Sequence, residues 1–132
     1  MKKPKISTLK KKADALYSRL IRLSYAEDGG MVKCFTCDRW YHWKQIQNGH
    51  FVGRSNLPTR YYDRNCHPQC YGCNCMKKGN YDEYAVRLVR KYGQDILEEL
   101  NEMKHEQQMK ISDYEELIEK FKEELKTYDI MD

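Results

Sequence analysis

The chain lacks a long hydrophobic run: within its 132 residues no apolar stretch approaches the roughly 18 residues that span a bilayer. The amino-terminal Met-Lys-Lys-Pro-Lys has no apolar stretch behind it, which is not the pattern of a secretory signal. Low-complexity segments are absent too. We therefore expect no membrane partner and an intracellular location, where thiols stay reduced and clustered cysteines bind metal rather than form disulfides.

Acidic residues are scarce in the first part of the chain. Residues 1–80 hold 16 Lys and Arg against 5 Asp and Glu, a balance of +11, whereas residues 81–132 hold 8 against 15, a balance of −7. A basic part of this size favours a polyanionic partner such as nucleic acid. The alternative is that basic and acidic surfaces neutralise each other across the molecule.

Cysteine, by contrast, is plentiful and patterned. Two Cys-x-x-Cys pairs lie about thirty residues apart, namely Cys34 with Cys37 and Cys70 with Cys73. This arrangement is typical of a closed tetrahedral zinc site. Four thiolates leave no open position for water, so the predicted zinc is structural and supplies much of the folding energy of a small core. Cys66 and Cys75 each lie beside a cysteine pair and are alternative ligands, but neither has the Cys-x-x-Cys spacing, and we interpret them as buried free thiols.

Three segments follow from these patterns. Residues 1–30 predict a basic amphipathic helix that ends at Gly29-Gly30. Residues 31–80 predict a core in which short strands form a hairpin before about residue 52, residues 53–69 form a loop, and the second cysteine pair opens a short helix. Residues 81–132 predict an acidic arm of helices with narrow apolar stripes. Such an arm packs on the core or on a second chain, and we predict a homodimer. The alternative is that these helices fold back on the N-terminal helix.

Several polar residues suggest a catalytic metal site beside the zinc. Phosphodiester cleavage needs a base that deprotonates water and a cation that neutralises the charge growing on the phosphate. His50 has the chemistry of the base. Asn74, directly after the last cysteine, can offer a carbonyl oxygen to Mg²⁺ or Mn²⁺. His67, three residues before Cys70, is placed to help hold that ion or to orient water.

Three more side chains complete this prediction. We expect Asn65 to tie the loop to the His50 strand through hydrogen bonds. Arg54 and Arg60 would flank the site and grip phosphate oxygens bidentately. A lone histidine is more often a packed or surface residue, and an asparagine after a cysteine pair can simply cap a helix. The fixed positions of His50 and Asn74 relative to the four cysteines favour the functional interpretation.

Between residues 34 and 93 the chain has an ordered set of motifs: Cys34-x-x-Cys37, Gly49-His50-Phe51, Asn65-x-His67-x-Gln69-Cys70-x-x-Cys73-Asn74, and Gly79-Asn80 with Tyr84. This set resembles the motifs of the phage NinG/Rap recombination endonucleases, within the wider HNH, or ββα-metal, nuclease group. Any one of these motifs is a weak signal, whereas their ordered combination is specific.

The resemblance implies a ββα-metal fold: a hairpin carrying the histidine, a loop, and a helix carrying the last asparagine. Together with the helices predicted above, this gives an α+β fold, a small zinc-bound core with an N-terminal helix and a C-terminal helical arm. It implies one-metal hydrolysis of DNA, with branched recombination intermediates as the preferred substrate, in the host cytoplasm if the chain is phage-encoded. By this likeness His50 is the general base, Asn74 a metal ligand and Asn65 the middle residue of the triad.

One departure from the group concerns the position before the catalytic histidine. Many relatives have a metal-binding Asp there, whereas this chain has Gly49. The second ligand must then come from elsewhere, with His67 as the first choice and Asp63 as the runner-up. If neither reaches the ion, His50 itself binds it and the identity of the base is open.

Two other functions compete with the nuclease. The missing Asp favours a non-catalytic zinc-binding module that holds DNA or RNA on the same basic face. A protein-interaction adaptor built on zinc and acidic helices would explain the C-terminal arm, but it would not explain the basic residues 1–80.

Overall fold

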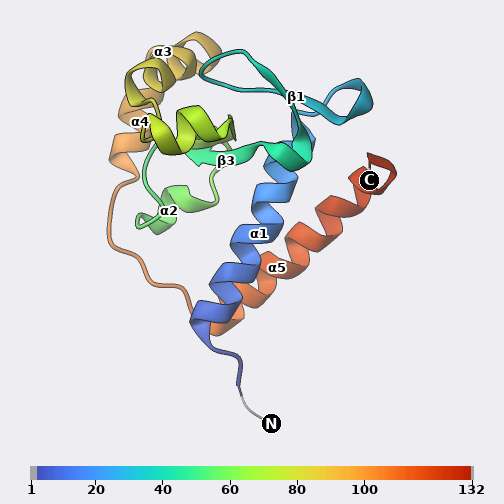
Figure 1. Ribbon diagram of the computed structural model, residues 1–132. Coiled ribbons are helices and arrows are strands. Elements are labelled where there is room, and N and C mark those ends of the chain that lie inside the picture. The colour runs from blue at the N-terminus through green and yellow to red at the C-terminus, as the bar shows by residue number, and fades with distance from the viewer. Residues whose placement is uncertain (1–2, 132) are drawn as a thin grey trace.

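A computed structural model describes the backbone of residues 3–131 and the side chains of residues 3–128. Residues 1, 2 and 132, at the ends of the predicted segments 1–30 and 81–132, lie outside the described residues. The described chain is a mixed α+β fold in which helices surround two small antiparallel sheets (Figure 1). None of its helices is long and apolar enough to cross a membrane.

Helix α1 (Ile6–Ser24) and helix α5 (Ile111–Leu125) lie side by side, although they come from opposite ends of the chain (Figure 1). Their apolar sides share one buried cluster, in which the ring of Phe121 lies 5.1 Å from that of Tyr17. Of the two possibilities raised by the sequence, the alternative that the C-terminal helices fold back on the N-terminal helix describes α5. This packing covers the apolar stripe of α5 that suggested a homodimer, which stays a prediction.

The first sheet carries the first cysteine pair. Strands β1 (Met31–Lys33) and β2 (Trp40–His42) form an antiparallel hairpin, and both cysteines lie in the connection between them. A 3₁₀ turn, η1 (Asp28–Gly30), precedes β1, and another, η2 (Trp43–Gln45), follows β2. The predicted hairpin is therefore confirmed up to β2.

The second sheet differs from the prediction, which placed all strands before about residue 52. Strand β3 (Gln47–His50) pairs antiparallel with β4 (Cys66–Gln69), so that His50 lies opposite Cys66. Residues 53–69, predicted as a loop, contain β4 together with helix α2 (Leu57–Arg60) and the 3₁₀ turn η3 (Asp63–Asn65). The sequence Cys-His-Pro-Gln of β4 has no apolar alternation, and its proline is tolerated because β4 lies at a sheet edge.

The second cysteine pair leads into a short helical turn, as predicted. This π-helical turn, η4 (Gly72–Met76), contains Asn74. Helices α3 (Tyr81–Tyr92) and α4 (Ile96–Glu102) follow and pack around Tyr84 against the segment after β3. A last 3₁₀ stretch, η5 (Lys126–Met131), continues from α5. The acidic arm is thus divided, with α3 and α4 beside the second sheet and α5 on α1 (Figure 1).

Candidate active site

The four cysteines of the two pairs come together in the fold. Their sulfur atoms all lie within 4.8 Å of one another, and Sγ of Cys37 lies 3.7 Å from Sγ of Cys70. A tetrahedral zinc ion with Zn–S bonds of about 2.3 Å separates its sulfurs by roughly 3.8 Å. Burial alone would raise the pKa of the Cys70 thiol, but hydrogen bonds from the Cys73 backbone and the neighbouring cysteines lower it to about 7. The cluster can therefore hold a zinc ion.

This cluster joins parts of the chain that carry the other site residues. Sγ of Cys34 accepts a hydrogen bond of 3.3 Å from the backbone nitrogen of Cys70, and the Asn80 amide donates to Sγ of Cys73 at 3.8 Å. The β1–β2 hairpin is thereby fixed to β4 and η4. Cys66 is buried, as predicted, whereas Cys75 is exposed and the prediction of a buried thiol was wrong there. Cys75 follows Asn74 in η4, and its exposed Sγ donates a hydrogen bond of 3.3 Å to Oε1 of Gln47.

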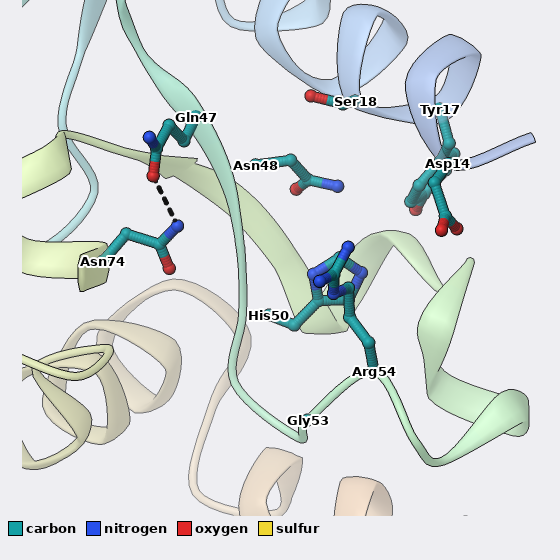
Figure 2. A pocket seen from close by; sticks show the side chains of 9 residues that line it. All are labelled: Asp14, Tyr17, Ser18, Gln47, Asn48, His50, Gly53, Arg54 and Asn74. Carbon is teal, nitrogen blue, oxygen red and sulfur yellow. Dashed lines mark hydrogen bonds between the residues drawn. The ribbon is translucent and has the colours of Figure 1, made fainter. Parts of the chain in front are cut away.

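A cavity of about 440 Å³ lies beside the cluster, between α1, β3 and η4 (Figure 2). It brings together three of the predicted site residues, His50, Arg54 and Asn74. Asn65, His67 and Arg60 do not line it. Its full lining is Asp14, Tyr17, Ser18, Gln47, Asn48, His50, Gly53, Arg54 and Asn74.

The imidazole of His50 is held in one tautomer. Its Nε2 lies 2.9 Å from the backbone oxygen of Arg60. Because a carbonyl oxygen only accepts, Nε2 carries the proton and Nδ1 keeps its lone pair. Burial lowers the pKa of His50 and the charges of Arg54 and Arg60 lower it further, although the bond to the Arg60 carbonyl opposes the shift. His50 is thus a neutral imidazole with an acceptor nitrogen at neutral pH.

Asn74 is oriented by the strand that carries His50. Its Nδ2 donates a hydrogen bond of 2.8 Å to Oε1 of Gln47, at the start of β3 (Figure 2). With the nitrogen used in this way, Oδ1 of Asn74 remains as the acceptor of the carboxamide in the cavity wall. An amide oxygen of this kind is a ligand for hard divalent cations.

Asn65 ties the chain together as predicted, but from inside the fold. It is fully buried, its Oδ1 accepts from the backbone nitrogen of Val52 at 2.7 Å, and its Nδ2 donates to the carbonyl oxygens of Val52 and Thr59. These bonds hold the segment after His50 against α2. Asn65 therefore positions the histidine strand and does not face the cavity.

Arg60 is also buried, which changes the role predicted for it. Its guanidinium pairs with the Asp14 carboxylate of α1, with Nε 2.9 Å from Oδ1, and it donates a further bond to the backbone oxygen of Arg54. The Tyr61 hydroxyl donates to the same carboxylate at 2.8 Å. Of the two predicted phosphate contacts, only Arg54 lines the cavity, because the guanidinium of Arg60 is engaged inside the protein.

His67 is a packed core residue. It is fully buried, with Nδ1 2.9 Å from the Tyr84 hydroxyl and Nε2 2.7 Å from the Tyr92 hydroxyl. Burial lowers its pKa to about 3, and the charge of Lys91 adds to the shift. Both ring nitrogens bond to tyrosine hydroxyls and do not face the cavity. His67, the first choice for the second ligand of the catalytic cation, therefore does not reach the site. Asp63, the runner-up, accepts a bond of 2.6 Å from Tyr17 and does not line the cavity either.

The comparisons with known proteins agree with the sequence motifs. A family model described as "Bacteriophage Lambda NinG protein" matches residues 2–130. The chain belongs to the NinG family. Proteins called NinG from Escherichia phage 933W and Escherichia phage lambda are each 29% identical to it over 83 residues, which is 62% of this chain and 41% of theirs. NinG of Enterobacteria phage H19B is 37% identical over 57 residues, 42% of this chain and 28% of its own length.

The matched region is thus less than half the length of these curated relatives. No solved structure matches the chain.

Six of the nine cavity residues of this NinG-family chain were not predicted from the sequence, among them Asn48 and Asp14. Asn48 stands two residues before His50, and strand alternation would have placed both side chains on one face once β3 was recognised. Asp14 is an acidic residue in a basic helix, and nothing in its local sequence indicates that it meets Arg60 from far along the chain.

Proposed function

We propose that this NinG-family chain is a metal-dependent DNA endonuclease that hydrolyses phosphodiester bonds, with branched recombination intermediates as its preferred substrate. One observation carries the proposal: the cavity joins a neutral imidazole with an available Nδ1, on His50, to the carboxamide oxygen of Asn74. The nearby cysteine cluster supports it, because a structural zinc ion would fix both residues to one rigid unit.

The arrangement of β3, β4 and η4 supports a ββα-metal core. The first strand of this unit carries His50, its antiparallel partner leads to the second cysteine pair, and the helical turn that follows carries Asn74. This is the order of elements that the HNH resemblance implies. The connection between the two strands is folded into α2 and η3 rather than being an open loop.

In the proposed reaction His50 accepts a proton from the attacking water at Nδ1. Asn74 would hold a divalent cation through Oδ1, and such a cation, when bound, neutralises the charge that grows on the phosphate. Arg54, the predicted phosphate contact that lines the cavity, would bind phosphate oxygens with its guanidinium. A positioned base contributes about 10² to 10⁴ to the rate of such a step.

A basic patch beside the cavity supports DNA as the substrate. Arg19 and Arg22 of α1 and Lys44 of η2 each lie within 5.5 Å of the centre of the Trp43 ring. Nε of Arg22 also donates to Oγ of Ser18 at 3.1 Å, which brings this positive charge to the cavity wall. A duplex that enters the cavity would therefore meet cations along its backbone.

Gly49 favours a second function, a non-catalytic zinc-binding module that binds nucleic acid. Many HNH nucleases have an Asp at this position that binds the catalytic metal, and a glycine has no side chain to do so. The two functions differ in one measurable property, the cleavage of bound DNA.

The decisive experiment compares cleavage of linear duplex, single-stranded and four-way DNA by the zinc-loaded protein, with and without Mg²⁺ or Mn²⁺. We expect cation-dependent cleavage that is fastest on the four-way junction. His50→Ala should reduce the rate at least about 100-fold, while DNA affinity stays within twofold. His105→Ala, at an exposed histidine, is the matched control. Binding without cleavage of any of these DNAs would select the non-catalytic module, and full activity of His50→Ala would remove His50 as the base.

A further inference from the structure

Asn48 contributes a carboxamide to the wall of the cavity. Its Oδ1 is buried and makes no hydrogen bond within the described residues. Figure 2 shows the side chain extending from β3 into the space between His50 and Ser18. Leaving such an acceptor buried and unpaired costs about 1 to 3 kcal/mol, which indicates that a ligand normally pairs with it.

We infer that Asn48 supplies the second protein ligand of the divalent cation, through Oδ1, alongside Asn74. The inference rests on the proposed function for the presence of that cation. Strand alternation places Asn48 on the same face of β3 as His50. The cation would then lie next to the base, where it can meet the same phosphate. Amide oxygens are suitable ligands for Mg²⁺ and Mn²⁺.

The other candidates for this role are excluded by their contacts. At Gly49 a Cβ atom would lie 1.9 Å from Oε1 of Gln69, so this position faces the packed interior. His67 has both ring nitrogens bound to tyrosine hydroxyls. The Asp14 carboxylate lines the cavity but is neutralised by Arg60. Among the described residues, Asn48 brings to the cavity a buried oxygen that these contacts do not engage.

A site built from two neutral carboxamides has a further consequence. Without a carboxylate ligand, the protein offers little charge to the cation, so binding in the absence of DNA should be weak and phosphate oxygens should complete the site. An added carboxylate at position 48 should therefore strengthen cation binding, whereas removal of the amide should weaken it.

The test is Mn²⁺ binding to the zinc-loaded protein, followed by electron paramagnetic resonance of the free ion. We expect Asn48→Ala to raise the half-saturating Mn²⁺ concentration at least tenfold and Asn48→Asp to lower it at least tenfold. Asn101→Asp, at an exposed asparagine of α4, adds the same charge elsewhere and should change it less than twofold. Zinc content and circular dichroism establish that each variant is folded.

The outcomes separate this inference from the proposed function. If Asn48→Ala binds Mn²⁺ as the wild type does, or Asn48→Asp binds it no more tightly than Asn101→Asp, Asn48 is not a ligand. That result leaves the nuclease standing if the wild type still cleaves DNA. If position 48 controls Mn²⁺ binding but no DNA is cleaved, the ligand assignment holds and the proposed function fails.

Discussion

Arg60 connects His50 to Asp14 of the N-terminal helix, through its backbone on one side and its side chain on the other. Its backbone oxygen lies 2.9 Å from Nε2 of His50, and its guanidinium binds the carboxylate of Asp14 in α1. The basic helix is therefore part of the support of the candidate base and not only a surface for DNA. A change at Asp14 is transmitted to the histidine through one residue.

The Asp14–Arg60 pair predicts an acid-sensitive part of the stability. Burial alone would raise the pKa of Asp14, but hydrogen bonds from Arg60 and Tyr61 and the charge of Arg60 hold it below the ordinary 3.8. A carboxyl group with a lowered pKa stabilises the fold above its ordinary pKa, and this contribution is lost as the pH falls through the folded value.

Asp14→Asn should therefore reduce the unfolding free energy by about 1 to 2 kcal/mol at pH 7. The difference from wild type should be the same at pH 5 and should shrink as the pH falls below 3.8. Urea unfolding in excess zinc measures it, with Asp82→Asn at an exposed position of α3 as the control. A difference that grows in acid would contradict the assignment.

Zinc should be required for the fold. The four sulfurs lie within 4.8 Å of one another, and the cluster fixes the β1–β2 hairpin to β4 and η4. Structural zinc sites in peptides contribute about 10 kcal/mol or more, comparable to the whole stability of a domain. We expect one zinc per chain, with loss of cooperative unfolding on chelation or in Cys73→Ser.

Cys75→Ser is the matched control for the zinc prediction, because Cys75 is exposed and stands outside the cluster. This variant should keep the full zinc content and the wild-type unfolding curve. Zinc content measured by atomic absorption decides the matter. A folded, metal-free Cys73→Ser protein would show that the cysteines are only core residues.

The parts of the fold that depend on local spacing could be predicted from the sequence. Apolar residues at helical intervals indicated α1, α3 and α5, and the Cys-x-x-Cys spacing indicated the four-sulfur cluster. The convergence of His50 and Asn74 on one cavity followed from their places relative to those cysteines. In these cases neighbours in sequence determine the geometry.

The missed features depend on partners far along the chain. Strand β4 is buried without an apolar alternation in its sequence. Its polar side chains can be buried because they bond to distant groups: His67, for example, bonds to the hydroxyls of Tyr84 and Tyr92. The same bonds remove His67 from metal binding. The burial of Arg60 depends on Asp14, 46 positions earlier. A sequence pattern states which groups can bind a phosphate or a metal, but not which of them are already engaged.

The close contact at Gly49 predicts that the metal-binding Asp of many HNH nucleases cannot be introduced at this position. A Cβ atom there would lie 1.9 Å from Gln69, whose amide donates to Thr36 and to the Gly79 carbonyl. Gly49→Asp should therefore cost at least about 2 kcal/mol of unfolding free energy, because it crowds the core and buries a charge. Gly53→Asp, where a Cβ meets open space, should stay within about 0.5 kcal/mol. A stable Gly49→Asp protein with tighter Mn²⁺ binding would show that position 49 can reach the cation.

The packing of α5 on α1 predicts that the C-terminal helix stabilises the fold through Phe121. Its ring lies 5.1 Å from that of Tyr17 and 5.8 Å from that of Tyr61. Phe121→Ala should lower the unfolding free energy by about 3 to 5 kcal/mol, since it leaves a cavity among buried rings. Glu119→Ala, which removes only an exposed ion pair of 3.6 Å with Lys122, should cost less than about 1 kcal/mol.

The concentration dependence of the loss in Phe121→Ala separates packing of α5 within one chain from packing between two chains. If Phe121 packs within one chain, the loss in Phe121→Ala is independent of protein concentration, as measured by urea unfolding over a hundredfold range. A loss that grows on dilution would instead place this face between two copies, because dissociation then contributes to unfolding. The burial of Phe121 against Tyr17 of its own chain favours the first result.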